Sequence, residues 1–203
     1  MVPDIQRTSP SLLLQIRDFD DREAWEKFSG IYKPLIQGYC QFFGVRPTDA
    51  EDLTQDILNV VLKNIHNFEY DPKKGYFRGW LKRIAKNKAI NHLSLRARSI
   101  DGSGRSSVRI AIENTPDQNA THDDFEWDKA YRRRLFEWAS EYVRSEVSEQ
   151  TWKAFWLTAI DEQSADQVGT LLNMSTGAVY GARCRVLARL KKYICEVVDE
   201  WPI

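Results

Sequence analysis

Residues 164–190 read SADQVGTLLNMSTGAVYGARCRVLARL, and this stretch decides which fold the C-terminal part of the chain can adopt. Ser164, followed three residues later by Gln167, forms a capping box that predicts the start of a short helix. The sequence Asn173-Met174-Ser175 is typical of a tight turn. A longer helix is expected from Ser175 or Thr176 to about Tyr193, and Ser148 can cap a further helix upstream. A short helix, a turn of about three residues and a longer helix form the helix-turn-helix pattern.

The second helix of this pair carries the residues that we expect to meet DNA. An α-helix fits the major groove, and Arg can pair bidentately with guanine or contact phosphate. The residues presented outward are Thr176, Tyr180, Arg183, Arg185 and Arg189. Two helices joined by a turn also occur in many folds, and a basic helix can simply be a solvated face. DNA binding is favoured by the caps, by the absence of acidic residues over 176–192 and by a small predicted core. That core consists of Val168, Leu172, Met174 and Val179.

Upstream, residues 48–65 show clear helical periodicity. Thr48 followed by Glu51 predicts a capping box at the start of this helix. Five apolar residues share one face, namely Leu53, Ile57, Val60, Val61 and Ile65. The opposite face is acidic and rich in amides, and includes Asp52, Gln55, Asp56 and Asn59. A solvated face is the first interpretation of such a surface, so a protein-binding role needs further support.

The segment 70–98 interleaves aromatic and basic residues, and a helix is predicted in it from about Tyr76 to Leu95. Basic groups can follow a phosphate backbone and aromatic faces can stack on unpaired bases, so the combination suits single-stranded or melting DNA. Phe77 and Trp80 lie on the apolar face and are better explained as core residues. The candidate contacts are Lys73, Lys74, Tyr76, Arg78, Lys82, Arg83 and Lys86.

The pattern of the whole chain predicts an all-α fold of two helical domains. A helix is expected from Asp20 or Asp21 to about Phe43, with Pro34 inside it. Residues 99–123 contain Gly, Ser, Asn and Pro with little helical periodicity, which predicts a flexible linker. We therefore expect one domain over 1–98, a linker over 99–123, and a helix-turn-helix domain over 124–203.

Charge is balanced overall but unevenly distributed along the chain. The 203 residues contain 29 Lys or Arg and 29 Asp or Glu, which taken alone argues against a nucleic-acid partner. Residues 71–98 nevertheless hold nine basic residues and one acid, and residues 113–149 hold ten acids and five basic residues. Phosphate binding depends on local charge more than on the total, so the segregation favours local positive surfaces.

Several other classes of protein are disfavoured by the composition. Cys40, Cys184 and Cys195 are scattered and none forms a CxxC pair, so reduced thiols are expected in place of disulfides or a metal site. We expect no metal, no cofactor and no catalytic site. No stretch approaches the run of about 18 apolar residues that a membrane span needs. The N-terminus lacks a signal-peptide pattern, so a cytoplasmic location without membrane insertion is expected.

Three stretches resemble parts of one known family. Asp49-Ala-Glu-Asp-Leu-Thr-Gln-Asp-Ile-Leu58 and Tyr70-Asp-Pro-Lys-Lys-Gly-Tyr-Phe-Arg-Gly-Trp-Leu-Lys-Arg-Ile-Ala-Lys-Asn-Lys-Ala-Ile-Asn-His-Leu93 look like the second region of bacterial sigma factors. Residues 164–190 look like the fourth region. The chain most resembles the extracytoplasmic-function (ECF) group, because no extra domain separates the two blocks and no long acidic extension precedes them.

The resemblance implies specific partners and roles. Members of this family bind core RNA polymerase, on a coiled coil of the β′ subunit and on the β subunit. The positions that match the coiled-coil contact are Asp52, Gln55, Asp56 and Asn59. Arg83, Asn87 and Asn91 match positions close to the unpaired strand of the minus-ten promoter element, and the last helix would read the minus-thirty-five element. An anti-sigma protein is a common partner in the group and is expected here on that ground alone.

The departures from the family pattern concern promoter reading. Gly181 and Ala182 stand where bulkier polar residues could sit, and Gln163 occupies a turn position where Gly is common. A stand-alone helix-turn-helix regulator is the alternative function. It would explain the C-terminal helices equally well but would leave residues 70–98 unexplained. A helical enzyme is disfavoured, because no acid–base or metal constellation can be defended.

Overall fold

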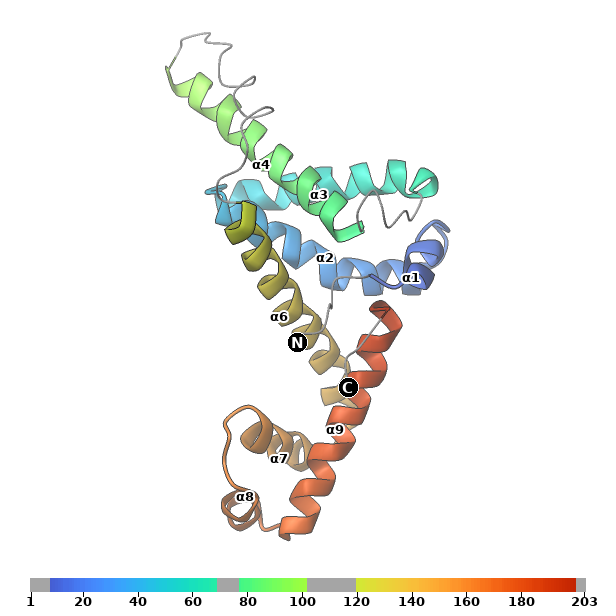
Figure 1. Cartoon of the computed structure of the whole chain (residues 1–203), viewed down its shortest axis with the longest axis vertical. Helices are drawn as coiled ribbons and strands as arrows, with labels where there is room; N and C mark the ends of the chain where they lie inside the picture. The colour runs from blue at the N-terminus through green and yellow to red at the C-terminus, as the bar shows by residue number, and fades with distance from the viewer. Residues whose placement is uncertain (1–7, 69–76, 102–119, 200–203) are drawn as a thin grey trace.

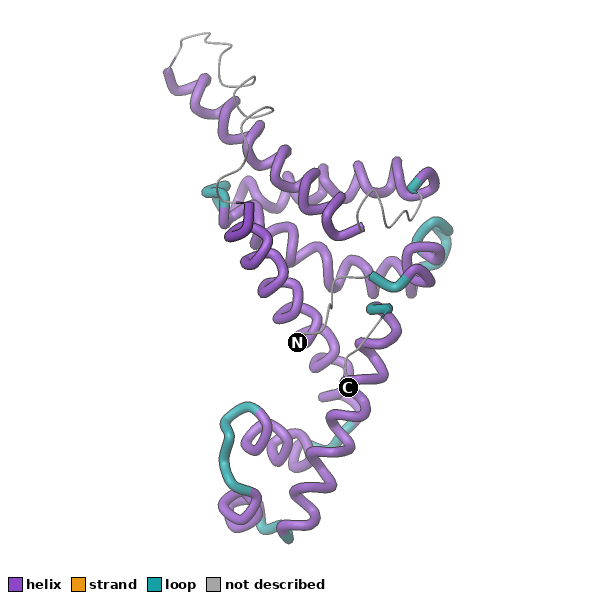
Figure 2. The backbone as a smooth tube through the Cα atoms, viewed as in Figure 1, coloured by secondary structure: helices purple, strands orange, loops and turns teal. Residues whose placement is uncertain are grey.

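The computed structural model describes residues 8–68, 77–101 and 120–199, and every regular element in these ranges is helical (Figures 1 and 2). The elements in order are α1 (Pro10–Gln15), α2 (Arg22–Phe42), α3 (Pro47–Asn64), a short 3-10 helix η1 (Ile65–Asn67), α4 (Phe77–Asp101), α6 (Ala120–Glu146), α7 (Glu149–Ala159), α8 (Ala165–Leu172) and α9 (Thr176–Val197). The predicted all-α class is confirmed. A single isolated bridge joins Thr8 to Val198 among the described residues.

Most predicted helix starts are confirmed by their caps. The Asp21 side chain accepts a hydrogen bond from the Ala24 amide at the start of α2, as Asp, Ser, Thr and Asn do at N-caps. Ser148 caps α7 and Ser175 caps α9 in the same way. Ser164 and Gln167 form the complete capping box at the start of α8.

The predicted capping box of α3 is wrong. The helix begins one residue before Thr48, at Pro47, and Arg46 is its N-cap without a side-chain cap. Proline is well suited to the first helical position because its φ is already helical and its missing N–H would have no partner there. The Pro47 start therefore replaces the hydroxyl cap that the Thr48 and Glu51 spacing suggested.

Helix α2 lies at the centre of the larger hydrophobic core and contacts α3, α4 and α6. Its residue Gly30 lets α6 approach closely, because a Cβ at this position would lie 3.0 Å from Cδ1 of Trp138. Arg134 Nε also donates to the Gly30 carbonyl at 2.9 Å. Tyr32 stacks on Tyr131 with ring centroids 5.9 Å apart. One continuous core thus joins the N-terminal helices to α6.

The described ends of the chain also meet. The Ser9 amide donates to the Val197 carbonyl at 2.9 Å, and Lys27 Nζ donates to the Glu196 carboxylate at 2.9 Å. Figure 1 shows the C-terminal end of α9 reaching towards α1, while α7 and α8 lie at the opposite end of the molecule. The division into domains at 98 and 123 stays a prediction, since the linker lies mostly outside the described residues.

The helix-turn-helix forms as predicted from α8 and α9. Asn173 ends α8 in the left-handed conformation with φ 53°, which Asn tolerates better than most residues. Gly169 is required by the turn, because a Cβ there would lie 2.7 Å from the Met174 carbonyl oxygen. The predicted small core is confirmed: Val168 and Val179 are fully buried with Ala182, and Leu172 and Met174 pack against them.

Candidate polymerase- and DNA-binding surfaces

Helix α3 presents all four predicted polymerase-binding residues to solvent. Its buried face packs on the core through residues such as Leu53, Ile57 and Val61. Asp52, Gln55, Asp56 and Asn59 are exposed on the other face. Their shared exposure follows from helical spacing, since residues three and four apart lie on one side of a helix. The surface offers carboxylates and amides that can accept hydrogen bonds or ion pairs from a partner.

Helix α4 divides the predicted DNA-binding residues between two stripes. Arg83, Asn87 and Asn91, each four residues apart, form an exposed stripe. Arg78, Lys82 and Lys86, also four residues apart, form a second stripe that is buried or half-buried. Lys73, Lys74 and Tyr76 lie outside the described residues.

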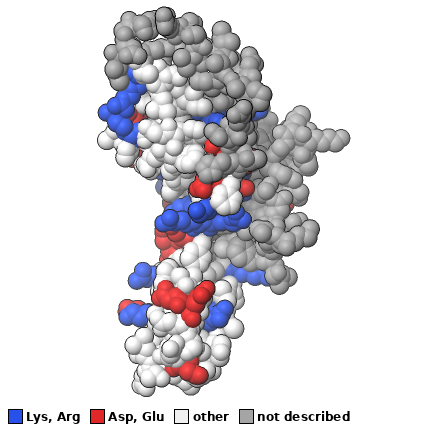
Figure 3. Space-filling view, turned by 60° about the vertical axis from the view of Figure 1, so that its left-hand side comes forward, with Lys and Arg blue, Asp and Glu red and all other residues white. Residues whose placement is uncertain are grey.

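Acidic residues of α6 form ion pairs with the second stripe of α4. Arg78 pairs with Asp128, Lys82 pairs with Asp124, and Lys86 Nζ lies 2.7 Å from the Asp123 carboxylate. We call these contacts the α4–α6 ion-pair row. The Arg78 guanidinium also lies 3.8 Å from the centre of the Tyr131 ring. On the face shown in Figure 3, positive and negative side chains of the described residues lie in neighbouring patches.

A second polar contact ties α4 to α3. Asp49 on α3 pairs with Arg46 at 2.9 Å, and His92 Nε2 of α4 lies 3.3 Å from the same carboxylate. Hydrogen bonds from the Arg46 side chain, then from His92, hold the pKa of Asp49 below its usual value. This contact fixes α4 relative to the candidate polymerase-binding face.

Most of the predicted DNA-binding residues of helix α9 are exposed to solvent. Tyr180, Arg183 and Arg185 are exposed, and within the described residues no acidic side chain pairs with either arginine. Thr176 is exposed as well, but its hydroxyl donates to Asp166 of α8 at 2.7 Å and so helps to close the turn. Arg189 is half-buried and lies 3.3 Å from Glu146 of α6.

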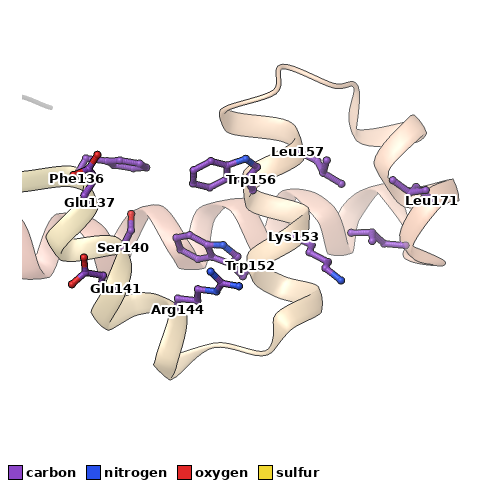
Figure 4. Close-up of a pocket in the computed structure, with 11 residues that line it drawn as sticks. Phe136, Glu137, Ser140, Glu141, Arg144, Trp152, Lys153, Trp156, Leu157 and Leu171 are labelled. Atoms are coloured by element: carbon purple, nitrogen blue, oxygen red, sulfur yellow. The ribbon is translucent and has the colours of Figure 1, made fainter. Parts of the chain in front are cut away.

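Sequence reasoning did not anticipate an apolar groove of about 800 Å³ between α6, α7 and α8 (Figure 4). Phe136, Trp152, Trp156 and Leu171 are among the residues that line it. The rings of Trp152 and Trp156 have centroids 5.9 Å apart, and Leu171 lies at the α8 end. The four-residue spacing of Trp152 and Trp156 could have indicated an aromatic face on α7. The sequence does not show that other helices leave part of this face uncovered.

The cysteines differ in environment. Cys40 is fully buried in α2, and burial raises the pKa of its thiol to about 11. Cys184 and Cys195 are exposed on α9. Within the described ranges no group of three or more His, Cys, Asp or Glu side chains is placed to hold a metal ion.

The sigma-70 region 2 family model matches residues 30–99, a span that contains α3 and most of α2 and α4. Over this span the chain is similar to region 2 of the sigma-70 family. The chain is also similar to the ECF RNA polymerase sigma factor RpoE of Cereibacter sphaeroides, with 29% identity over 83 residues. That match covers 41% of this chain and 45% of the relative, so the aligned part spans just under half of the relative's length.

A solved structure is also similar to the chain, namely CnrH in complex with the cytosolic domain of CnrY. It matches with 20% sequence identity and a TM-score of 0.36, and the match covers 92% of this chain and 96% of that one.

Proposed function

We propose that this protein is an ECF-type sigma factor that binds core RNA polymerase, directs it to promoters and helps to open the DNA. The observation that carries the proposal is the match of residues 30–99 to sigma-70 region 2. Within this span, α3 exposes the candidate polymerase-binding face and α4 exposes a polar stripe. A helix-turn-helix whose second helix lacks acidic residues over 176–192 and exposes Arg183 and Arg185 supports a second promoter contact.

The two DNA surfaces would have different tasks. Helix α9 would enter the major groove of the minus-thirty-five element, where Arg183 and Arg185 can pair with guanine or contact phosphate. The exposed stripe of α4 would hold the parted strand of the minus-ten element. Asn87 and Asn91 suit this task, because an amide can donate and accept hydrogen bonds to an unpaired base. Capture of the strand would offset unpairing, which costs about 1.4 kcal/mol per step.

The partners follow from the same proposal. Core polymerase would bind through its β′ coiled coil at Asp52, Gln55, Asp56 and Asn59, with a further contact to the β subunit. An anti-sigma protein stays a prediction, as does the cytoplasmic location. None of the described helices combines the length and the low polarity that crossing a membrane requires.

Binding to core polymerase tests this proposal against a stand-alone helix-turn-helix regulator. The full chain should be retained by immobilised core polymerase. Asp56→Arg should weaken retention by about tenfold or more, since a reversed charge at a protein interface opposes association. Glu26→Arg, at an exposed position of α2, is the matched control and should be retained like the wild type. Failure of the wild type to bind core polymerase would reject the sigma function.

A further inference from the structure

The acidic start of α6 lies against three cations that the proposed function assigns to DNA. The pairing runs in opposite directions along the two helices: Arg78 meets Asp128 near one end of the row, and Lys86 meets Asp123 at the other. Three contacts four residues apart on α4 therefore face residues 123–128 near the start of α6. Both helices pack on α2, and α4 contacts α6 through these ion pairs and through the Arg78 guanidinium over the Tyr131 ring.

The ion-pair row is partly removed from water. Arg78 and Asp123 have only 4% and 5% of their surfaces exposed. Ion pairs in such surroundings are screened by salt much less than pairs on an open surface. Next to the row, Tyr39 of α2 packs edge-on against Trp127 with ring centroids 4.7 Å apart, so apolar burial holds the start of α6 against α2. Asp123 also lies in the first turn of α6, where the helix dipole favours a negative charge.

A carboxylate and a DNA phosphate are both oxyanions, and both accept charge-assisted hydrogen bonds from Lys and Arg. Each carboxylate of the row thus holds a cation in the way that a phosphate would. The Arg78 side chain cannot reach a nucleic acid while it is enclosed by Asp128 and Tyr131. By contrast, Arg83, Asn87 and Asn91 are exposed in the same arrangement.

We propose that residues 123–128 of α6 compete within the chain for the phosphate-binding stripe of α4, so that the free protein is closed to single-stranded DNA. This inference rests on the proposed function, because it concerns the control of the same DNA-binding surface. The closed chain retains only the exposed stripe for DNA. Displacement of α6 when core polymerase binds would release Arg78, Lys82 and Lys86 for the phosphates of the parted strand.

The first test removes the competing charges from the full chain. The variant carries Asp123→Asn, Asp124→Asn and Asp128→Asn, which keep side-chain size. Its binding to fluorescent oligo(dT) is measured by anisotropy across NaCl concentrations. Binding should be tighter than that of the wild type at low salt. The slope of log K against log [NaCl] should steepen by up to about 2, since each single-strand phosphate contact contributes roughly 0.7.

The matched control removes three exposed charges for which no ion pair is seen among the described residues, by Glu26→Gln, Asp161→Asn and Glu162→Gln. It should bind oligo(dT) with the wild-type slope. Equal slopes for the Asp variant and this control would overturn the inference, because general loss of negative charge would then explain any gain.

The second test needs no substitution and is independent of variant folding. Hydrogen exchange of the wild type is compared with and without core polymerase. The amides of residues 123–131 should lose protection in the complex, and unchanged or increased protection overturns the inference. If the wild type binds core polymerase and these amides do not respond, only the competition is rejected. If it does not bind core polymerase at all, the proposed function itself fails.

Discussion

Helices α4 and α9 are both proposed to bind DNA, but they differ in what lies against them. On α9, Arg183 and Arg185 are exposed and have no acidic partner among the described residues. On α4, Arg78, Lys82 and Lys86 are each paired with an aspartate of α6. A run of basic residues in the sequence is therefore not by itself an available positive surface. The number of charges that can contact a phosphate depends on which stripe of the helix faces solvent.

The comparison is tested most strongly by removing Arg78. Arg78→Ala leaves the Asp128 carboxylate without its partner and removes the cation over Tyr131. We expect the free energy of unfolding to fall by about 3 kcal/mol, the lower end of the range for breaking a buried pair, because Asp128 is partly exposed. Urea unfolding of the full chain measures this loss.

Arg83→Ala, five residues further along α4 on the exposed stripe, is the control for Arg78→Ala. Its free energy of unfolding should lie within about 0.5 kcal/mol of the wild type, as is usual for surface substitutions. Equal losses in the two variants would contradict the division of α4 into two stripes.

A smaller effect, on binding alone, is expected from Arg183→Ala on α9. The substitution should weaken upstream promoter binding by about 1–3 kcal/mol, the usual range for a lost base contact. The free energy of unfolding should be unchanged, because the Arg183 side chain is exposed and has no ion-pair partner among the described residues. Footprinting of the holoenzyme measures promoter occupancy, and unchanged occupancy would show that another face of the helix meets the DNA.

The smallest effect is expected from Arg189→Ala. Arg189 and Glu146 are each about two-fifths exposed, and exposed pairs contribute about 0.2–1 kcal/mol to stability. Promoter occupancy should fall less than for Arg183→Ala, because Arg189 is engaged with α6. A larger loss of occupancy than for Arg183→Ala would assign Arg189 to the DNA and reverse the order of the two residues.

Local signals made much of this fold predictable. The caps at Asp21, Ser148 and Ser164 depend on residues three positions away, and helical spacing was enough to place Asp52 and Asp56 on an exposed face. The start of α3 was mispredicted because Pro47 outweighs the Thr48 hydroxyl as a helix-starting residue.

The pairing of α4 with α6 was not predictable in the same way. The partners are 37 to 50 residues apart in the chain. The four-residue spacing of Arg78, Lys82 and Lys86 and the nearby acids were visible, but which helix faces which stripe depends on tertiary packing around residues such as Gly30 and Trp138. Sequence reasoning therefore grouped all the cations of α4 as one DNA-binding set, and their contacts with DNA stay predictions.

Run-off transcription with purified core polymerase on genomic fragments directly tests whether the chain acts as a sigma factor. Core polymerase with the wild-type chain should give discrete transcripts that core polymerase alone does not give, and Asp56→Arg should abolish them while Glu26→Arg preserves them. A wild-type chain that binds DNA fragments but yields no such transcript with core polymerase would contradict the account and leave a helix-turn-helix regulator in its place.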